Sequence, residues 1–103
     1  MYNRYLFAKN IYKDYVILIA KKGKYYSFDK DKRILDYINP KNGKIIYILK
    51  KFSINFVVLD DLEILGIGKF KINNYYKYLY LSYFKKILFE MNGRFANEQY
   101  CSS

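Results

Sequence analysis

The chain has 103 residues, of which 19 are Lys or Arg and 9 are Asp or Glu, so its formal net charge is +10. A chain of this length forms one domain with a modest core, and the excess of cations favours polyanions as partners. It has no histidine and one cysteine, Cys101, which excludes histidine-dependent triads, a cysteine zinc site and a disulfide framework.

Other general features favour a cytoplasmic protein that does not enter a membrane. The longest apolar run, residues 15–20, is too short to span a bilayer, and we expect no signal peptide at the N-terminus. Tyr and Phe together supply 22 residues, more than a small core holds, so some rings should be exposed. Codon usage in an AT-rich genome, which enriches Lys, Asn, Ile and Tyr, explains the same composition without any binding function.

The first predicted elements are a helix and a buried strand. Asn3 caps the helix, which runs to about Lys13, and the strand covers residues 15–20. The strand has no polar alternation, which is typical of a central strand covered on both faces. The apolar face of the helix consists of residues spaced three and four apart, namely Tyr5, Ala8, Ile11 and Tyr12.

A basic turn and two further helices are predicted next. Lys21-Lys22-Gly23-Lys24 forms the turn, and residues 25–28 return as an antiparallel strand. A helix begins at Asp29 or Asp31 and buries Ile34, Leu35 and Ile38, after which Asn39-Pro40 and Asn42-Gly43 interrupt the chain. The clearest helical spacing in the sequence is that of Ile45, Ile48, Leu49 and Phe52, ended by Ser53.

The last part of the chain completes an α/β (α+β) fold. Residues 54–59 form a second apolar strand, expected parallel to the first and beside it, and residues 60–70 hold a turn and an edge strand. A final helix, capped by Asn73 or Asn74, runs to about Met91. Its predicted buried stripe is Tyr76, Leu79, Tyr80, Tyr83 and Ile87. We therefore expect one domain over residues 1–91, with a small mixed sheet whose central strands are 15–20 and 54–59, and a flexible tail over 92–103.

The order of elements in residues 1–61 resembles the N-terminal mismatch-recognition domain (domain I) of MutS proteins. That domain has a strand followed by a Gly-x-Phe-Tyr-Glu motif and an acid-started helix, and Gly23-Lys24-Tyr25-Tyr26-Ser27 occupies the place of the motif here. The resemblance implies that Tyr25 stacks on a base and that Ser27 stands where the family has glutamate. Short free-standing relatives on mobile elements are the nearer analogy, because no clamp or ATPase domain is present in the chain.

These observations predict a non-catalytic nucleic-acid-binding module. The expected contact residues are Lys21, Lys22 and Lys24 for phosphates, with Tyr25, Tyr26 and Ser27 at the base; one of the two tyrosines should be core and the other exposed, since strand neighbours alternate. Duplex or distorted DNA is the expected partner. We expect no cofactor and no metal, and we interpret Asp60-Asp61-x-Glu63 as a solvated turn rather than a nuclease site.

Two other interpretations fit the same sequence. The chain suits a phage or mobile-element inhibitor or accessory protein that binds a protein or nucleoprotein, for example a CRISPR effector. It also suits a self-associating protein, a homodimer, because the tyrosine-rich last helix is apolar for a monomer. Aromatic packing of a strand and a solvated lysine turn explain the hairpin residues without any function.

Overall fold

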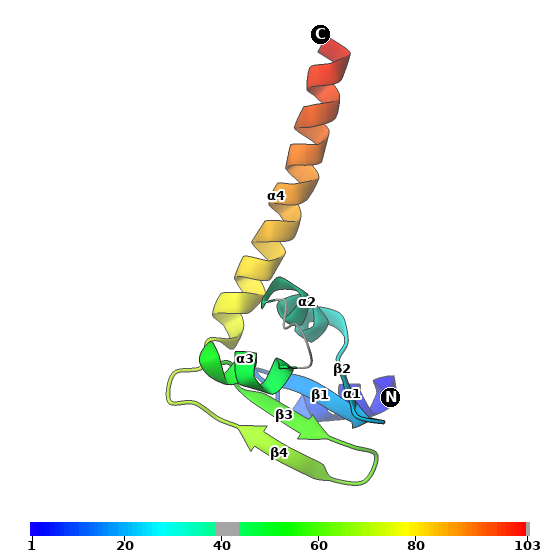
Figure 1. The fold of residues 1–103 in the computed structure, drawn as a ribbon, viewed down its shortest axis with the longest axis vertical. Coiled ribbons are helices and arrows are strands. Elements are labelled where there is room, and N and C mark those ends of the chain that lie inside the picture. Colours follow the sequence, from blue (N-terminus) through cyan, green and yellow to red (C-terminus); the bar gives the residue numbers. More distant parts are fainter. Residues whose placement is uncertain (39–43, 103) are drawn as a thin grey trace.

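The computed structural model describes residues 1–38 and 44–102, and of residues 86, 89 and 92–102 only the backbone. It has three layers, with helix α1 (Tyr2–Ile11) on one face of a sheet and three helices on the other (Figure 1). These are α2 (Asp29–Ile38), α3 (Ile45–Lys51) and α4 (Tyr75–Ser102). The predicted break at Asn39-Pro40 and Asn42-Gly43 lies outside the described residues.

The sheet has four strands in the order β2-β1-β3-β4. They are β1 (Val16–Lys21), β2 (Lys24–Tyr26), β3 (Phe56–Leu59) and β4 (Ile64–Gly68). β1 and β3 run parallel, with Val16 opposite Phe56, while β2 and β4 pair antiparallel at the two edges. The predicted mixed sheet with two parallel central strands is therefore confirmed, and the fold is α+β.

The apolar side chains of β1 and β3 are divided between two cores, as a strand covered on both faces requires. Ile17, Ile19, Val57 and Leu59 pack under α1 with Tyr5 and Ala8. Val16, Leu18, Phe56 and Val58 pack on the opposite face with Ile34, Leu35, Leu49, Ile54 and Tyr75. The expectation that both strands are buried on both faces is confirmed.

The predicted apolar face of α1 is only partly correct. Tyr5 and Ala8 are buried, but Ile11 is 61% exposed. The side chain of Lys9 is mostly buried instead, with 12% of it exposed. A helix presents positions three and four residues apart on one face, so Lys9 shares the buried face with Tyr5. The spacing of apolar residues did not identify Lys9 as buried, because the group that neutralises its charge, Asp31, belongs to a distant segment of the chain.

Two polar residues lie at helix ends as the sequence predicts, Ser53 after α3 and Asn73 before α4. Ser53 follows α3 with a φ of 55°, a left-handed conformation that ends a helix. The side-chain oxygen of Asn73 accepts a hydrogen bond from the N–H of Tyr75 in the first turn of α4 and another from the N–H of Asn55 beside β3. Asn73 thus ties the start of α4 to the central strand.

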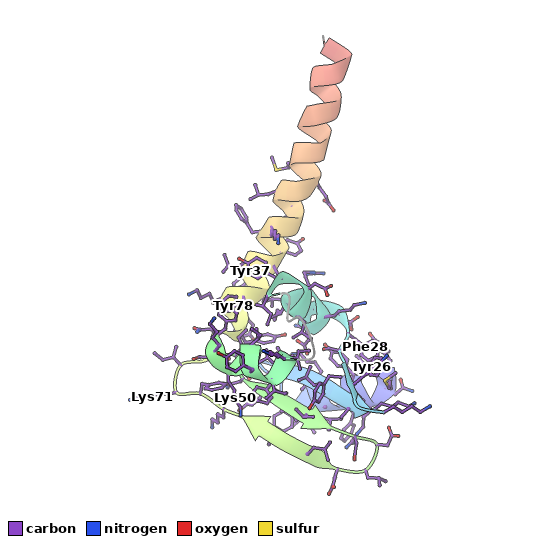
Figure 2. All side chains as sticks on the ribbon, in the orientation of Figure 1. Tyr26, Phe28, Tyr37, Lys50, Lys71 and Tyr78 are labelled. Atoms are coloured by element: carbon purple, nitrogen blue, oxygen red, sulfur yellow. The ribbon has the colours of Figure 1, made fainter. Side chains whose placement is uncertain are left out.

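Helix α4 departs from the prediction in its buried face and in its length. Tyr75 and Ser82 are buried and Tyr78 and Leu79 partly so, whereas Tyr76, Tyr80, Tyr83 and Ile87, which we expected in the core, are exposed. The ring of Tyr78 lies 6.2 Å from that of Tyr37 on α2 (Figure 2). The backbone stays helical to Ser102, past Asn92-Gly93, since a helical Gly costs only about 1 kcal/mol.

Beyond its first turns α4 leaves the body of the protein. It projects away from the three layers as a single helix (Figure 1) and sets the longest dimension of the molecule, 59 Å against 29 and 28 Å. The sequence gives no signal for this geometry, because the apolar residues of the helix lie on all sides and do not indicate which side meets the core.

Candidate nucleic-acid interface

The hairpin between β1 and β2 is closed by a two-residue turn. Lys22 and Gly23 both have positive φ angles, 51° and 75°, as the mirror-image turns favoured in hairpins require. The strands pair Lys21 with Lys24, Ala20 with Tyr25 and Ile19 with Tyr26. The turn thus brings three lysines to one end of the sheet, with two tyrosines directly behind them.

All three lysines and both tyrosines of the hairpin are accessible. Lys21, Lys22 and Lys24 are exposed, and Tyr25 and Tyr26 are 41% and 37% exposed. The prediction that one of the tyrosines belongs to the core is wrong. Alternation does send them to opposite faces of the sheet, but β2 is a three-residue edge strand and neither ring is completely covered by a helix.

Lys21 and Lys24 lie directly opposite each other across the hairpin. Like charges in this position destabilise a strand pair. None of the ion pairs in the described part of the chain involves a hairpin lysine. The end of the hairpin therefore holds uncompensated positive charge that an anion would relieve.

Ser27, which we expected at the base, is half-buried and bonded to the neighbouring strand. Its hydroxyl donates a hydrogen bond of 2.8 Å to the carbonyl of Ile17 on β1. This bond extends the pairing of β1 with the chain beyond the end of β2. Ser27 therefore has a structural partner, and it also lines a hollow that Tyr25 and Tyr26 border.

Two hollows adjoin the tyrosines. One, of about 590 Å³, is bounded by Tyr25, Tyr26, Phe28, Lys32 and Asp36 and lies between the hairpin and α2. The other, of about 320 Å³, extends from Tyr25 to Lys50 on α3 and to Leu65 and Ile67 on β4. Tyr25 borders both hollows, so a flat group placed in either of them would meet its ring.

A buried polar centre that the sequence did not predict joins three helices to the sheet. Lys9 Nζ lies 2.8 Å from Asp31 Oδ1, and the Tyr75 hydroxyl donates to the same oxygen at 2.6 Å. The other oxygen of Asp31 accepts a bond of 3.0 Å from the N–H of Ile17. Lys9 also donates to the Tyr75 hydroxyl and to the carbonyl of Tyr15. Both charges are thus paired and hydrogen-bonded, as buried charges must be.

Burial shifts the ionisation of this centre. It lowers the pKa of Lys9, and the negative charge of Asp31 opposes that shift. It raises the pKa of the Tyr75 hydroxyl, and the charge of Asp31 and the hydrogen bond to it raise that pKa further. Burial likewise raises the pKa of the nearby Tyr5, again reinforced by Asp31. Both phenols therefore stay neutral over the ordinary pH range.

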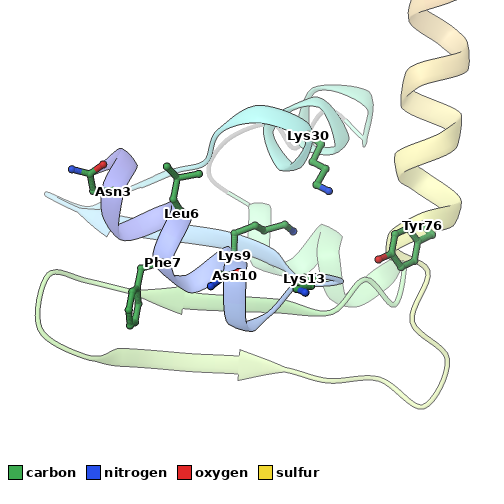
Figure 3. A pocket seen from close by; sticks show the side chains of 8 residues that line it. All are labelled: Asn3, Leu6, Phe7, Lys9, Asn10, Lys13, Lys30 and Tyr76. Atoms are coloured by element: carbon green, nitrogen blue, oxygen red, sulfur yellow. The ribbon is translucent and has the colours of Figure 1, made fainter.

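A second basic surface lies on the α1 side. Figure 3 shows a groove between α1, α2 and the start of α4 that is lined by Asn10, Lys13, Lys30 and Tyr76, with Lys9 at its floor. Its volume is about 690 Å³. The charge of Lys9 is matched by Asp31, which leaves Lys13 and Lys30 as the free cations that line this groove.

The acids at 60–63 form a turn, as the sequence interpretation has it. The Asp60 carboxylate accepts hydrogen bonds of 2.8 Å from the N–H groups of Leu62 and Glu63, and these bonds lower its pKa. The Asp60 N–H in turn donates to the carbonyl of Glu63. Among the described residues there is no cluster of three or more acids, histidines or cysteines suited to a metal ion.

Comparisons with models of protein families, with curated proteins and with solved structures gave no match. The resemblance to the MutS domain therefore stays a prediction. Within the described part of the chain, no helix combines the length and the apolar character needed to cross a membrane.

Proposed function

We propose that the protein is a non-catalytic nucleic-acid-binding module that uses the β1–β2 hairpin as its contact surface. Lys21, Lys22 and Lys24 bind backbone phosphates, and Tyr25 stacks on a base. The observation that carries this proposal is the combination of three exposed lysines and two accessible rings on one edge of the sheet. Phosphate contacts supply affinity and position, while an aromatic ring accepts any base through its flat face.

The role of each tyrosine follows from its surroundings. Tyr25 is the more accessible of the two and borders both hollows, so it is the better stacking residue. Tyr26 lies on the opposite face of the strand and flanks the strand of nucleic acid. Stacking of this kind contributes about 1–3 kcal/mol per base, which adds to the electrostatic contribution of the lysines.

A preference for mismatched DNA is not part of the proposal. In the MutS family the motif glutamate contacts the mispaired base, and the residue in its place here, Ser27, is hydrogen-bonded to the backbone of β1. A base that replaced this bond would have to compensate for the unpaired Ile17 carbonyl. We therefore expect distorted duplexes and single strands to bind through their accessible bases, without discrimination by a carboxylate.

The hairpin is a stronger candidate than the groove beside α1. The groove has two free lysines on its lining, and its third lysine is neutralised by Asp31. At the hairpin three lysines are unpaired and two of them are opposed. A polyanion gains more from the second arrangement, because binding there also relieves repulsion between the lysines.

The experiment is a titration of fluorescently labelled oligonucleotides followed by anisotropy. Perfect duplex, mismatched duplex and single-stranded DNA are compared at low and at near-physiological salt. The proposal predicts binding at low salt that weakens steeply as salt rises, with the mismatched and single-stranded probes bound at least as tightly as the perfect duplex. Absence of binding to every probe at low salt would reject the proposal.

A further inference from the structure

The projecting part of α4 carries a second apolar face that nothing in the described chain covers. At 100° per residue, the face that packs on the body is defined by Tyr75, Tyr78, Leu79 and Ser82. Leu81, Phe84, Leu88 and Met91 point about 140° away from it, and all four are exposed. The helix is therefore apolar on two sides, of which the protein itself uses one.

The spacing of the exposed residues is that of a helix pair. Leu81, Phe84, Leu88 and Met91 follow one another at steps of three, four and three residues. This is the alternation by which two helices pack with interlocking side chains along a seam. Lys77, one step of four before Leu81, marks the end of the seam nearest the body. We call these four apolar residues the α4 seam.

The α4 seam and the apolar side chains that flank it together expose enough area for a stable dimer, and the seam alone supplies about half of it. In the described part of α4 the exposed large apolar side chains are Tyr76, Tyr80, Leu81, Tyr83, Phe84, Ile87, Leu88 and Met91, between 37% and 69% exposed. At roughly 100 Å² for each half-exposed side chain they present about 800 Å². That is the area that one partner contributes to an interface of standard size. An exposed patch of this extent is unusual on a monomer.

We infer that the α4 seam binds the same seam of a second copy, with the two helices antiparallel. The charges favour this orientation. Each copy has a net charge of +10, and a parallel pair would place both bodies at the same end of the helices, where they repel. An antiparallel pair that crosses near Phe84 separates the bodies. It also brings Lys77 of one copy opposite Met91 of the other, since both lie on the seam side of the helix.

This inference is independent of the proposed nucleic-acid contact, since the hairpin and the α4 seam lie on different elements. It is tested by sedimentation equilibrium of the purified protein without nucleic acid. The expected mass is twice the 12.5 kDa of one chain. The double variant Phe84→Glu/Leu88→Glu should sediment as a single chain, with an unchanged circular dichroism spectrum of the folded body.

The matched control is Leu6→Glu/Phe7→Glu, which places the same two charges on exposed apolar positions of α1, outside the seam, and should remain dimeric. Orientation is tested with the sole native cysteine, Cys101, replaced by serine. A mixture of Lys77→Cys and Met91→Cys proteins should form the mixed disulfide, and Lys77→Cys alone should not cross-link. A wild-type protein of single-chain mass, a dimer that survives the double variant, or cross-linking of Lys77→Cys with itself would overturn the inference.

Discussion

Lys9 on α1 and Asp31 on α2 form a buried ion pair, with 2.8 Å between Nζ and Oδ1, although 22 residues separate them in the chain. The carboxylate also accepts from Tyr75 on α4 and from the backbone of β1. One side chain thus links three helices and the central strand, across both faces of the sheet. The pair holds α1 to the helices on the opposite face.

Removing one member of this pair should destabilise the fold strongly. Lys9→Met leaves the Asp31 carboxylate buried without its cation, and a broken buried pair costs about 3–5 kcal/mol. The double variant Lys9→Met/Asp31→Leu removes both charges, so it should lose less than the sum of the two single variants. Urea denaturation of the four proteins measures this coupling. Additive losses would show that the two charges do not interact.

The phenols of the same centre predict a loss of stability in alkaline solution. The pKa of Tyr75 and that of Tyr5 are raised in the folded protein, so these groups stabilise the fold below the unfolded pKa of about 10. That contribution is lost as the pH rises above this value, because the unfolded chain releases protons that the folded chain keeps. Lys9, whose pKa is lowered, acts in the opposite direction only up to about pH 10.5.

Denaturant unfolding between neutral pH and pH about 11 tests the predicted loss of stability in alkaline solution. We expect the free energy of unfolding to fall above pH about 10, and to fall less steeply in Tyr75→Phe, which has one buried phenol fewer. Tyr47, exposed on α3, supplies the control, and Tyr47→Phe should follow the wild-type profile. A wild-type free energy that is flat across this range would refute the assignment.

The two glycines of β4 should respond differently to the same substitution. A Cβ on Gly68 would lie 2.2 Å from Cε1 of the Phe56 ring, whereas a Cβ on Gly66 would have nothing within 4 Å. Phe56 is buried in the core, so its ring has little room to move. Gly68→Ala should therefore cost about 1–3 kcal/mol, with Gly66→Ala near neutral. Thermal unfolding of both variants measures the two losses of stability. Equal losses would contradict the close packing of Gly68 against the Phe56 ring.

Most of the fold could be predicted from the sequence because its central strands are wholly apolar. Residues 15–20 and 54–59 have one interpretation only, a pair of strands covered on both faces, and the structure has them parallel and adjacent. The basic turn was equally clear, since Gly23 accepts a positive φ without strain. Where a segment has a single low-energy conformation, its local residue pattern is sufficient to predict its structure.

The buried centre and the face of α4 could not be predicted, for two physical reasons. The pairing of Lys9 with Asp31 depends on a contact between distant segments. The only local signal for it in the sequence is that Lys9 lies four residues after Tyr5, on the buried side of α1. In α4, apolar residues occupy every side of the helix, so spacing alone did not separate the core face at Tyr75 from the exposed seam at Phe84. The hydrogen bond of Ser27 was missed for the first of these reasons, since its partner is on another strand.

Substitution of Tyr25 should weaken binding without weakening the fold. Tyr25→Ala removes an exposed ring from an edge strand, and we expect single-stranded DNA to bind about 5- to 150-fold more weakly, the equivalent of about 1–3 kcal/mol of stacking. Tyr47→Ala removes an exposed ring from α3 that borders neither of the hollows beside Tyr25, and this variant should bind like the wild type. Anisotropy titrations at one fixed salt concentration compare them. Equal affinities for the two variants would remove Tyr25 from the contact.

The most direct test of the hairpin contact is the salt dependence of binding to duplex DNA. Each phosphate contact contributes about −0.9 to the slope of log K against log salt, so Lys21→Gln/Lys22→Gln/Lys24→Gln should make the slope less negative by about 2 to 3. Lys13→Gln/Lys30→Gln, which alters the groove beside α1, should leave it nearly unchanged. If the hairpin variant keeps the wild-type slope and the groove variant has the less negative slope instead, the contact surface lies on the α1 side of the protein and the proposal is wrong.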